Sequence, residues 1–356
     1  MSRRLIAAVV AAATPAFAAA QTNITLFGIA DAGVAAVNRG GSTSNSIKVD
    51  SGFNSTSRWG MRGTEDLGGG LSTFFKLEGE ITFDTGGGDG GGPLNFARGS
   101  YVGLQGGLGQ VWLGRDYVSG YFAMQDFDIN RYGLFGNLLT FLTGYQGGTA
   151  NGITYGTVAG MATRVSNGIF YKTPNFGGST IQIHVGLGER DIPPKTGGNN
   201  IGVGWLFSRG PWNASAWYHD RKIVAGTATT TTKEYGGGGG YNFGGFKVVA
   251  GFGVGDPDGP TKVRFGNVGV SAQVGGGEVI AQVIRLKESA SQGTGTSFSL
   301  GYMYPLSKRT NLYSSIGTTR NNDTGGFVFR GAGISYSPDV LGADPRGVVV
   351  GIRHLF

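Results

Sequence analysis

The feature that most constrains the fold is a two-residue alternation of apolar and polar side chains that recurs along the chain. In residues 73–84, Phe75, Leu77, Ile81 and Phe83 share one face of a predicted strand. The opposite face carries four charged side chains, those of Lys76, Glu78, Glu80 and Asp84. A soluble sandwich would bury the apolar face in a core. Repeated strands with one apolar and one charged face instead indicate a barrel that is apolar outside and wet inside.

The connections between these strands alternate between short and long. Seven short turns lie at 67–70, 106–109, 175–178, 209–211, 244–245, 275–277 and 306–310. Eight longer segments lie at about 38–55, 85–94, 117–163, 190–198, 223–231, 255–261, 288–294 and 320–345. This pattern predicts an all-β fold, a 16-stranded antiparallel transmembrane β-barrel. Because an open sheet edge cannot face lipid, the last strand, ending at Phe356, must pair with the first.

The first twenty residues have the pattern of a cleaved secretory signal peptide. A basic start is followed by an apolar run at 5–13 and by small residues at 18–20. After them, no window of eighteen apolar residues exists, which excludes a helical membrane protein. Charged residues make up only 14% of the chain, against about 25% in soluble domains, and no second composition regime is present. We therefore expect an exported single domain over residues 21–356.

One segment, residues 117–163, is too long for an ordinary connection and lacks a sustained period. It carries nine aromatic residues: Tyr117, Tyr121, Phe122, Phe127, Tyr132, Phe135, Phe141, Tyr145 and Tyr155. Disordered segments are poor in aromatic residues, so this loop is expected to pack against something. A barrel interior offers such a surface, which predicts a pore narrowed by its own loop.

Several motifs along the mature chain are similar to one family. They are FGIAD at 27–31, SRWGMRGTEDLGGGL at 57–71, YVGL at 101–104, LGR at 113–115, YKTPNFG at 171–177, Tyr302 with LSKRT at 306–310, and GIRHLF at 351–356. Together they resemble the trimeric general porins of Gram-negative outer membranes, especially the anion-selective ones. The resemblance implies three barrels per assembly, each with its third loop folded inward as a constriction, here residues 117–163.

The resemblance also implies a ladder of wall arginines that faces this loop, at Arg58, Arg98 and Arg164. The alternation turns Arg58 and Arg164 inward, whereas Arg98 shares the parity of outward-facing Val102 and needs a bulge at Gly99 to point inward. Such guanidiniums can pass an anion from one site to the next.

An alternative is that the arginines only pair with wall carboxylates, Glu78 and Glu80. On the loop side, Asp126, Asp128 and Arg131 complete the expected constriction, and its two carboxylates should moderate the anion preference.

The expected function is therefore a general diffusion porin of the cell outer membrane, a water-filled channel for small hydrophilic solutes and ions with modest anion preference. Expected partners are a homotrimer, outer-membrane lipid and lipopolysaccharide, and the barrel-assembly machinery through the strand ending at Phe356. The small residues Ala30, Ala32, Gly33, Ala35 and Ala36 of the first strand allow close contact between barrels.

Other functions have weaker support in the sequence. A substrate-specific channel for a sugar or an organic anion would use the loop aromatics, whereas a structural or adhesive barrel would not need a loop facing arginines. An enzyme is not expected, because none of the three histidines sits beside a motif serine. We expect no cofactor and no metal site, since neither ligand spacing nor a complete calcium loop is present. The run Gly236–Gly240 is expected to be a flexible strand region rather than a phosphate loop.

Overall fold

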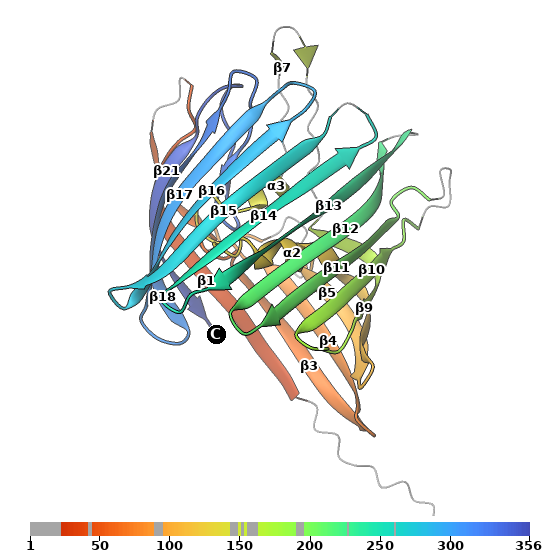
Figure 1. Ribbon diagram of the computed structural model, residues 1–356. Helices are drawn as coiled ribbons and strands as arrows, with labels where there is room; N and C mark the ends of the chain where they lie inside the picture. Colours follow the sequence, from red (N-terminus) through yellow and green to blue (C-terminus); the bar gives the residue numbers. More distant parts are fainter. Residues whose placement is uncertain are drawn as a thin grey trace, which may run out of the picture.

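The computed structural model describes residues 23–41, 45–88, 95–142, 149–150, 153–154, 163–189, 196–225, 228–259 and 261–356. The predicted signal peptide, 1–20, lies outside these residues. The described chain is almost entirely β structure arranged around a central space, with two short helices inside the ring of strands (Figure 1). No helix among the described residues has the length and apolar character needed to cross a membrane.

The wall strands are β1 (Asn23–Asn38), β2 (Ser46–Ser51), β3 (Arg58–Gly68), β4 (Leu71–Glu80), β5 (Gly99–Gly106), β6 (Gly109–Tyr117), β9 (Arg164–Lys172), β10 (Ser179–Gly186), β11 (Asn200–Arg209), β12 (Trp212–Ala225), β13 (Ala228–Asn242), β14 (Phe246–Pro257), β15 (Val263–Val274), β16 (Gly277–Glu288), β17 (Thr294–Pro305), β18 (Thr310–Asn321) and β21 (Arg346–Leu355). The remaining elements are α2 (Ser119–Asp126), α3 (Leu139–Leu142), β7 (Thr149–Ala150), β8 (Ile153–Thr154), β19 (Phe329–Arg330) and β20 (Ser335–Tyr336).

These strands form one closed antiparallel sheet. Each pairs with its neighbour along the chain, and β21 pairs with β1 from Ile29↔Leu355 to Asn38↔Arg346. Both β2 and β3 pair with β1, so they are two halves of one wall strand interrupted at residues 52–57. Counted this way, the described chain forms a barrel of sixteen strands, which confirms the predicted fold class, including the pairing of the last strand with the first.

The interruption at residues 52–57 has a local cause. The carboxylate of Asp31 accepts hydrogen bonds from the backbone N–H groups of Phe53 (3.0 Å) and Ser55 (2.8 Å), and the Ser57 hydroxyl donates to the Asp31 carbonyl oxygen (2.9 Å). These bonds fold the segment inward over β1, where the side chain of Phe53 is completely buried. The sequence pattern instead assigned residues 38–55 entirely to a loop.

A second difference concerns residues 223–231, which the sequence pattern assigned to a long loop. Strands β12 and β13 continue through most of this segment, to Ala225 and from Ala228. Its threonines are β-branched, and such residues favour strands.

The two faces of the wall differ as the alternation predicts. Apolar side chains point outward and remain exposed, for example Val268 (58%), Ile316 (56%) and Val350 (61%). The inward positions of the same strands carry small or polar residues such as Asn267 and Ser315, both of which are buried. Their burial shows that something covers part of the inner face.

Candidate functional site

Part of the inner face is covered by the segment that follows β6. Its helix α2 lies against β11, β12 and β13. Further along, Asn130 and Gly136 contact β16 and β17, because the Gln282 amide donates to the Gly136 carbonyl oxygen (3.1 Å) and the Asn130 amide lies 3.4 Å from the hydroxyl of Ser299. The described residues 118–138 therefore extend across the inside of the barrel from one side of the wall to the other.

Two wall histidines hold the start of helix α2. The first N–H groups of a helix lack partners within the helix. Here Nδ1 of His184 accepts from the backbone N–H of Ser119 (3.1 Å), and Nε2 of His219 accepts from that of Gly120 (2.9 Å). A ring nitrogen that accepts a hydrogen bond carries no proton, so the other ring nitrogen of each histidine is the donor. Nε2 of His184 donates to Asn200 (3.1 Å), and Nδ1 of His219 donates to Glu234 (3.3 Å).

The same contact corrects one sequence-based statement. No histidine is near a motif serine in the sequence, yet the fold brings the hydroxyl of Ser119 to 2.8 Å from Nδ1 of His184. Both side chains are completely buried, so they present no surface to a substrate. The pair anchors the helix to the wall.

The residue after helix α2, Phe127, fills a depression in the wall made by glycines. A Cβ at Gly238 would lie 2.5 Å from the Phe127 ring, and one at Gly251 would lie 2.2 Å from it. The ring is completely buried and stacks near Trp217 and Phe265, at centroid distances of 5.9 and 6.4 Å. The run Gly236–Gly240 is thus the interior of strand β13, where the absent side chains make room for the loop.

The next turn is organised around the carboxylate of Asp128. Its Oδ1 accepts from the N–H of Asn130 (3.2 Å) and from Nε2 of Gln282 (2.9 Å), and its Oδ2 accepts from the N–H groups of Tyr132 (3.1 Å) and Leu138 (2.9 Å). Burial raises the pKa of this carboxyl to about 6, and these donors oppose the rise. Since all four of its partners are N–H donors, both carboxylate oxygens act as acceptors, and the bond to Gln282 connects the turn to the wall.

A cavity of about 720 Å³ lies between this segment and the wall. Five cationic side chains line it: Arg58, Lys76, Arg131, Lys247 and Arg353. Three acidic side chains also line it: Asp116, Asp128 and Glu278. Asp116 and Asp128 are buried and hydrogen-bonded, Asp116 through Oδ2 to Nε1 of Trp112 (3.1 Å), so five cationic groups face three acidic ones, of which two are buried. The cationic side chains therefore dominate the charge that a solute in this cavity meets.

Of the predicted constriction residues, Arg58, Arg131 and Asp128 line this cavity. Arg58 is partly exposed and lies 3.6 Å from the Glu78 carboxylate. Arg131, on the loop, is exposed, and its backbone adopts a left-handed φ of 47°.

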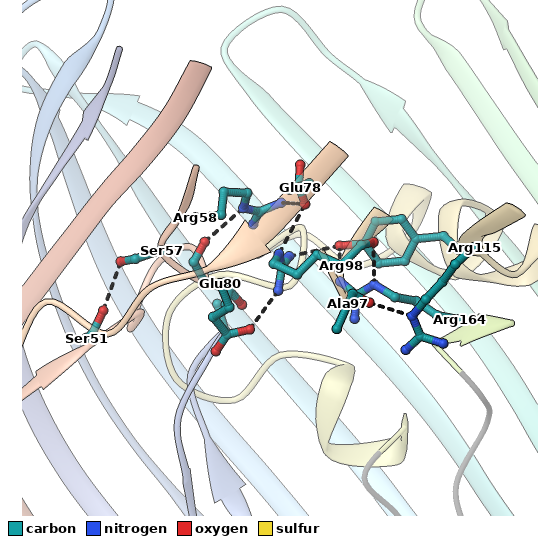
Figure 2. Close-up of polar contacts among 12 residues, drawn as sticks. Ser51, Ser57, Arg58, Glu78, Glu80, Ala97, Arg98, Arg115 and Arg164 are labelled. Atoms are coloured by element: carbon teal, nitrogen blue, oxygen red, sulfur yellow. Dashed lines mark hydrogen bonds and ion pairs between the residues drawn. The ribbon is translucent and has the colours of Figure 1, made fainter. Parts of the chain in front are cut away.

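The other predicted residues are close by but turned to different partners. The guanidinium of Arg98 is buried and donates to Glu78 (3.1 Å), Glu80 (3.0 Å) and the Tyr117 hydroxyl (3.0 Å), as Figure 2 shows for the two carboxylates. Arg98 precedes the first paired residue of β5, so strand parity does not apply to it, and its side chain lies on the inner side of the wall. Glu78, bound by Arg58, Lys76 and Arg98, is buried as well.

Arg164 and Asp126 are also held by neighbouring groups. Arg164, labelled beside Arg98 in Figure 2, donates to the carbonyl oxygen of Arg98 (2.9 Å). It also donates to the Tyr117 hydroxyl (2.6 Å), and its guanidinium lies 4.2 Å from the centre of the Tyr117 ring. The Asp126 carboxylate accepts from the Asn213 amide (2.7 Å), and burial raises its pKa. The alternative of arginines paired with wall carboxylates thus describes Arg98 well and Arg58 in part.

Three of the cavity's cations were not among the predicted constriction residues: Lys76, which the alternation placed on the charged face of its strand, Lys247 and Arg353. Lys247 follows exposed Phe246 in β14, and Arg353 follows exposed Ile352 in β21. Because successive side chains of a strand point to opposite faces, both cations point inward. Arg353 lies near the end of the last strand, and the pairing of β21 with β1 places it beside Asp31 and in the same cavity as Arg58.

Comparison with known proteins gives consistent matches. A family model described as Gram-negative porin matches residues 7–324. Outer membrane porin protein 32 of Delftia acidovorans is 36% identical over 100% of both chains, and an outer membrane porin protein of Bordetella pertussis is 29% identical, again over 100% of both.

Among solved structures, an anion-selective porin from Comamonas acidovorans has a TM-score of 0.82 at 35% identity, covering 94% of this chain and 100% of that one. A trimer form of OmpT from Vibrio cholerae has a TM-score of 0.67 at 14% identity, covering 94% of this chain and 99% of that one, which shows the fold alone.

Proposed function

The chain belongs to the Gram-negative porin family, and from this premise we propose that its channel prefers anions and that the loop 117–163 narrows it. As a member of the family, it is an outer-membrane β-barrel that forms a water-filled channel for small hydrophilic solutes and ions. Known members are channels rather than enzymes, and the absence of catalysis in this chain is part of the proposal.

The observation that carries the anion preference is the charge of the cavity beside the loop. Cations reach it from several parts of the wall and from the loop itself, because Arg58, Lys247 and Arg353 lie on different strands and Arg131 lies on the loop. A guanidinium and an anion about 4 Å apart attract by roughly 4 kcal/mol at an effective dielectric near 20, but by about 1 kcal/mol in bulk-like water. Confinement by the loop is therefore what lets these charges select.

The preference should be modest rather than absolute. The carboxylates of Asp128 and Glu278 also line the cavity, and charges within a Debye length of about 8 Å offset part of the field at physiological salt. The similar anion-selective porin from Comamonas acidovorans supports the sign of the preference.

The test is the zero-current potential of single reconstituted channels in a salt gradient. We expect the sign for anion preference in the unmodified protein, and a smaller potential after Arg58→Glu. Arg164→Glu should change the potential less, because Arg164 does not line the cavity and its guanidinium is bound to Tyr117 and to a carbonyl oxygen. A potential of the opposite sign in the unmodified protein would contradict the proposal.

A second candidate function, a channel for organic anions, is favoured by the aromatic residues in the same cavity. The rings of Tyr117 and Tyr121 stack at 4.0 Å, Tyr132 lies 4.7 Å from Tyr121, and Tyr101 and Phe122 also line the space. Aromatic faces beside cations suit a carboxylate with an apolar body. Benzoate should then reduce the chloride current at millimolar concentration, whereas acetate should not; equal effects of the two would exclude this function.

The assembly of the chain is proposed to be a homotrimer, supported by the trimer form of the structurally similar OmpT. Outward-facing Ala30, Ala32 and Ala36 on β1 permit close contact, whereas Gly33 and Ala35 turn inward against Phe53 and the core and are not available to a neighbour. Unheated protein should migrate as an SDS-resistant oligomer that collapses on boiling; monomers by light scattering in mild detergent would contradict this. Recognition of the strand ending at Phe356 by the barrel-assembly machinery is part of the same proposal.

A further inference from the structure

The two histidines at the start of helix α2 can hold it only while they are uncharged. Nδ1 of His184 accepts from the backbone N–H of Ser119 and lies 2.8 Å from its hydroxyl, and Nε2 of His219 accepts from the N–H of Gly120. A protonated imidazole has two N–H donors and no acceptor. A proton on either accepting nitrogen would therefore make a donor face a donor. The positive end of the helix dipole lies at the same place, so an added positive charge is repelled there.

The contact between helix and wall is too close for a charged ring to be accommodated in place. Both rings lie over Gly202 of β11, where a Cβ would be 2.2 Å from the His219 ring and 2.5 Å from the His184 ring. On the helix side, a Cβ at Gly120 would be 2.4 Å from the Trp217 ring. The two imidazoles are 5.1 Å apart between their centres, and neither has exposed surface. Hydration of a charged ring thus requires the helix to move.

The charged groups beside the pair compensate a proton at one ring only. The helix packs against β10, β11, β12 and β13, and on these strands the charged groups next to the histidines are Glu234 and Arg221. Glu234 accepts from Nδ1 of His219 (3.3 Å) but is also paired with Arg221 (2.6 Å). Within the part of the chain that the structure describes, His184 has no carboxylate at ion-pair distance, and its second nitrogen donates to the neutral amide of Asn200. His184 is therefore the ring for which a proton costs most.

The charged groups on the next strands are bound elsewhere. Arg164 of β9 donates to the Tyr117 hydroxyl, and Asp116 of β6 accepts from Trp112. The surface that His184 meets on β9 is the ring of Phe170, at a centroid distance of 6.1 Å. These strands supply no charge that would stabilise a protonated His184.

A cavity at the long-loop end of the wall reaches the partners of both histidines. It has a volume of about 420 Å³ and is lined by Asn200, Arg221 and residues 187–188 and 197–198 of the connection between β10 and β11. Asn200 is bonded to His184, and Arg221 to the Glu234 that holds His219. Protons from this side therefore have a short route to the pair.

Helix α2 in turn carries side chains of the channel cavity. Tyr121, Phe122 and Gln125 all line it, and the Tyr121 ring stacks on Tyr117 at 4.0 Å. The helix lies inside the ring of strands, so its release from the wall displaces these side chains into the passage (Figure 1).

We propose that His184 and His219 are positioning residues of the channel, which hold helix α2 against the wall at neutral pH and release it in acid, so that the loop closes the passage. The inference rests on the proposed function in one respect, that this loop narrows the channel. The released state binds more protons than the anchored state, so acid favours release. Free imidazole takes up a proton near pH 6.5, and each histidine that is neutral only when anchored contributes about tenfold per pH unit below that value.

The first test is the ratio of closed to open time of single reconstituted channels between pH 7.5 and pH 4.5. This ratio should rise about tenfold per pH unit below about pH 6.5 if His184 alone responds, and about a hundredfold if both histidines do. Asp128 also loses its charge in this range, but it is present in every variant used here, so its contribution is common to all of them.

The decisive variant is His184→Asn with His219→Gln. The side-chain oxygen of asparagine lies near the position of Nδ1, and that of glutamine near the position of Nε2, so both backbone N–H groups keep an acceptor that takes up no proton. This variant should conduct as the unmodified protein does at pH 7.5 and should lack the histidine part of the acid response. His354→Asn is the matched control, because His354 is exposed and its partner is Thr310 (2.8 Å); it should respond as the unmodified protein does. Each single variant should keep a weaker response, which tests the proposal even if the double variant does not fold.

The second test, amide hydrogen exchange at Ser119 and Gly120, does not depend on ion flow. After correction for the intrinsic effect of pH, exchange at both positions should accelerate between pH 6.5 and pH 4.5 in the unmodified protein and not in the double variant. Unchanged exchange in acid, or the same acid response in the double variant as in the unmodified protein, would overturn the proposal. Faster exchange without channel closure would support release of the helix and contradict the proposed narrowing by the loop.

Discussion

Replacing Asp128 by asparagine should release the loop from the inner wall without unfolding the barrel. The carboxylate accepts four hydrogen bonds, two on each oxygen, and all four donors are N–H groups. Asparagine keeps one acceptor oxygen but presents an NH₂ group to the other two donors. A hydrogen bond to a charged group contributes about 1.5–3 kcal/mol, so losing two should reduce the local stability of the turn by about 3–6 kcal/mol.

Hydrogen exchange measured at pH 8, where the carboxylate is ionised, is the direct assay. A local destabilisation of about 3–6 kcal/mol corresponds to amide exchange faster by two to four orders of magnitude, since each 1.4 kcal/mol is tenfold. The effect should appear at Asn130, Tyr132 and Leu138, whereas the wall amides should exchange as before.

The matched control is Asp126→Asn, which removes the same charge two residues earlier in the loop. The Asp126 carboxylate accepts a side-chain bond from Asn213, which an amide oxygen can still accept. In Asp126→Asn, amide exchange at Asn130, Tyr132 and Leu138 should therefore change little. Unchanged protection of the Asp128 turn in Asp128→Asn, or equal loss in both variants, would refute the role assigned to this carboxylate.

Three further predictions concern the loop and the cavity. In Gly238→Ala the new Cβ would lie 2.5 Å from the Phe127 ring and from the Ala250 carbonyl oxygen, so overpacking should destabilise the folded protein by about 1–3 kcal/mol and increase the current noise of single channels. The control is Gly266→Ala, in which the nearest atom to the new Cβ would be 3.9 Å away and the current noise should not change. Equal noise in both variants would contradict the fit of Phe127 into the wall. His184→Phe leaves the Ser119 N–H without its acceptor and should weaken the start of helix α2 by about 1–3 kcal/mol, seen as faster exchange at Ser119, whereas His354→Phe at an exposed position should have no such effect. Because burial raises the pKa of Asp128 to about 6, lowering the pH from 8 to 5 neutralises this carboxylate, as Asp128→Asn does at every pH; the zero-current potential should therefore change with pH more in the unmodified protein than in Asp128→Asn, and an equal change in both would contradict the assignment.

The wall of this protein is predictable from its sequence because one face of each strand points toward the apolar exterior of the barrel and the other toward its wet interior. The alternation of Phe75 and Leu77 with Lys76 and Glu78 sets the register, and a one-residue slip would reverse every side chain. The same rule could have identified Lys247 and Arg353 as inward-facing cations, since both alternate with exposed apolar residues.

The contacts that position the loop are not predictable in this way. His184 and His219 are 65 and 99 residues away in sequence from the residues whose backbone N–H groups donate hydrogen bonds to them, and Gln282 is 154 residues from Asp128. These pairs form only after the barrel has closed and the loop has folded inward, so no local period marks them. Arg98 is a related case, because it lies just before a strand, where the alternation no longer determines the direction of the side chain.

The central claim, that cations from the wall and the loop give the channel its anion preference, is tested most directly by reversing one charge on each side of the cavity. Arg58→Glu combined with Arg131→Glu changes a wall residue and a loop residue that both line it. In single channels under a salt gradient, we predict that the zero-current potential changes sign in this variant and keeps its sign in Arg209→Glu with Lys233→Glu, where exposed cations of the outer surface are reversed. An unchanged potential in the cavity variant, with the oligomer still SDS-resistant, would show that these side chains do not control the path of the ions.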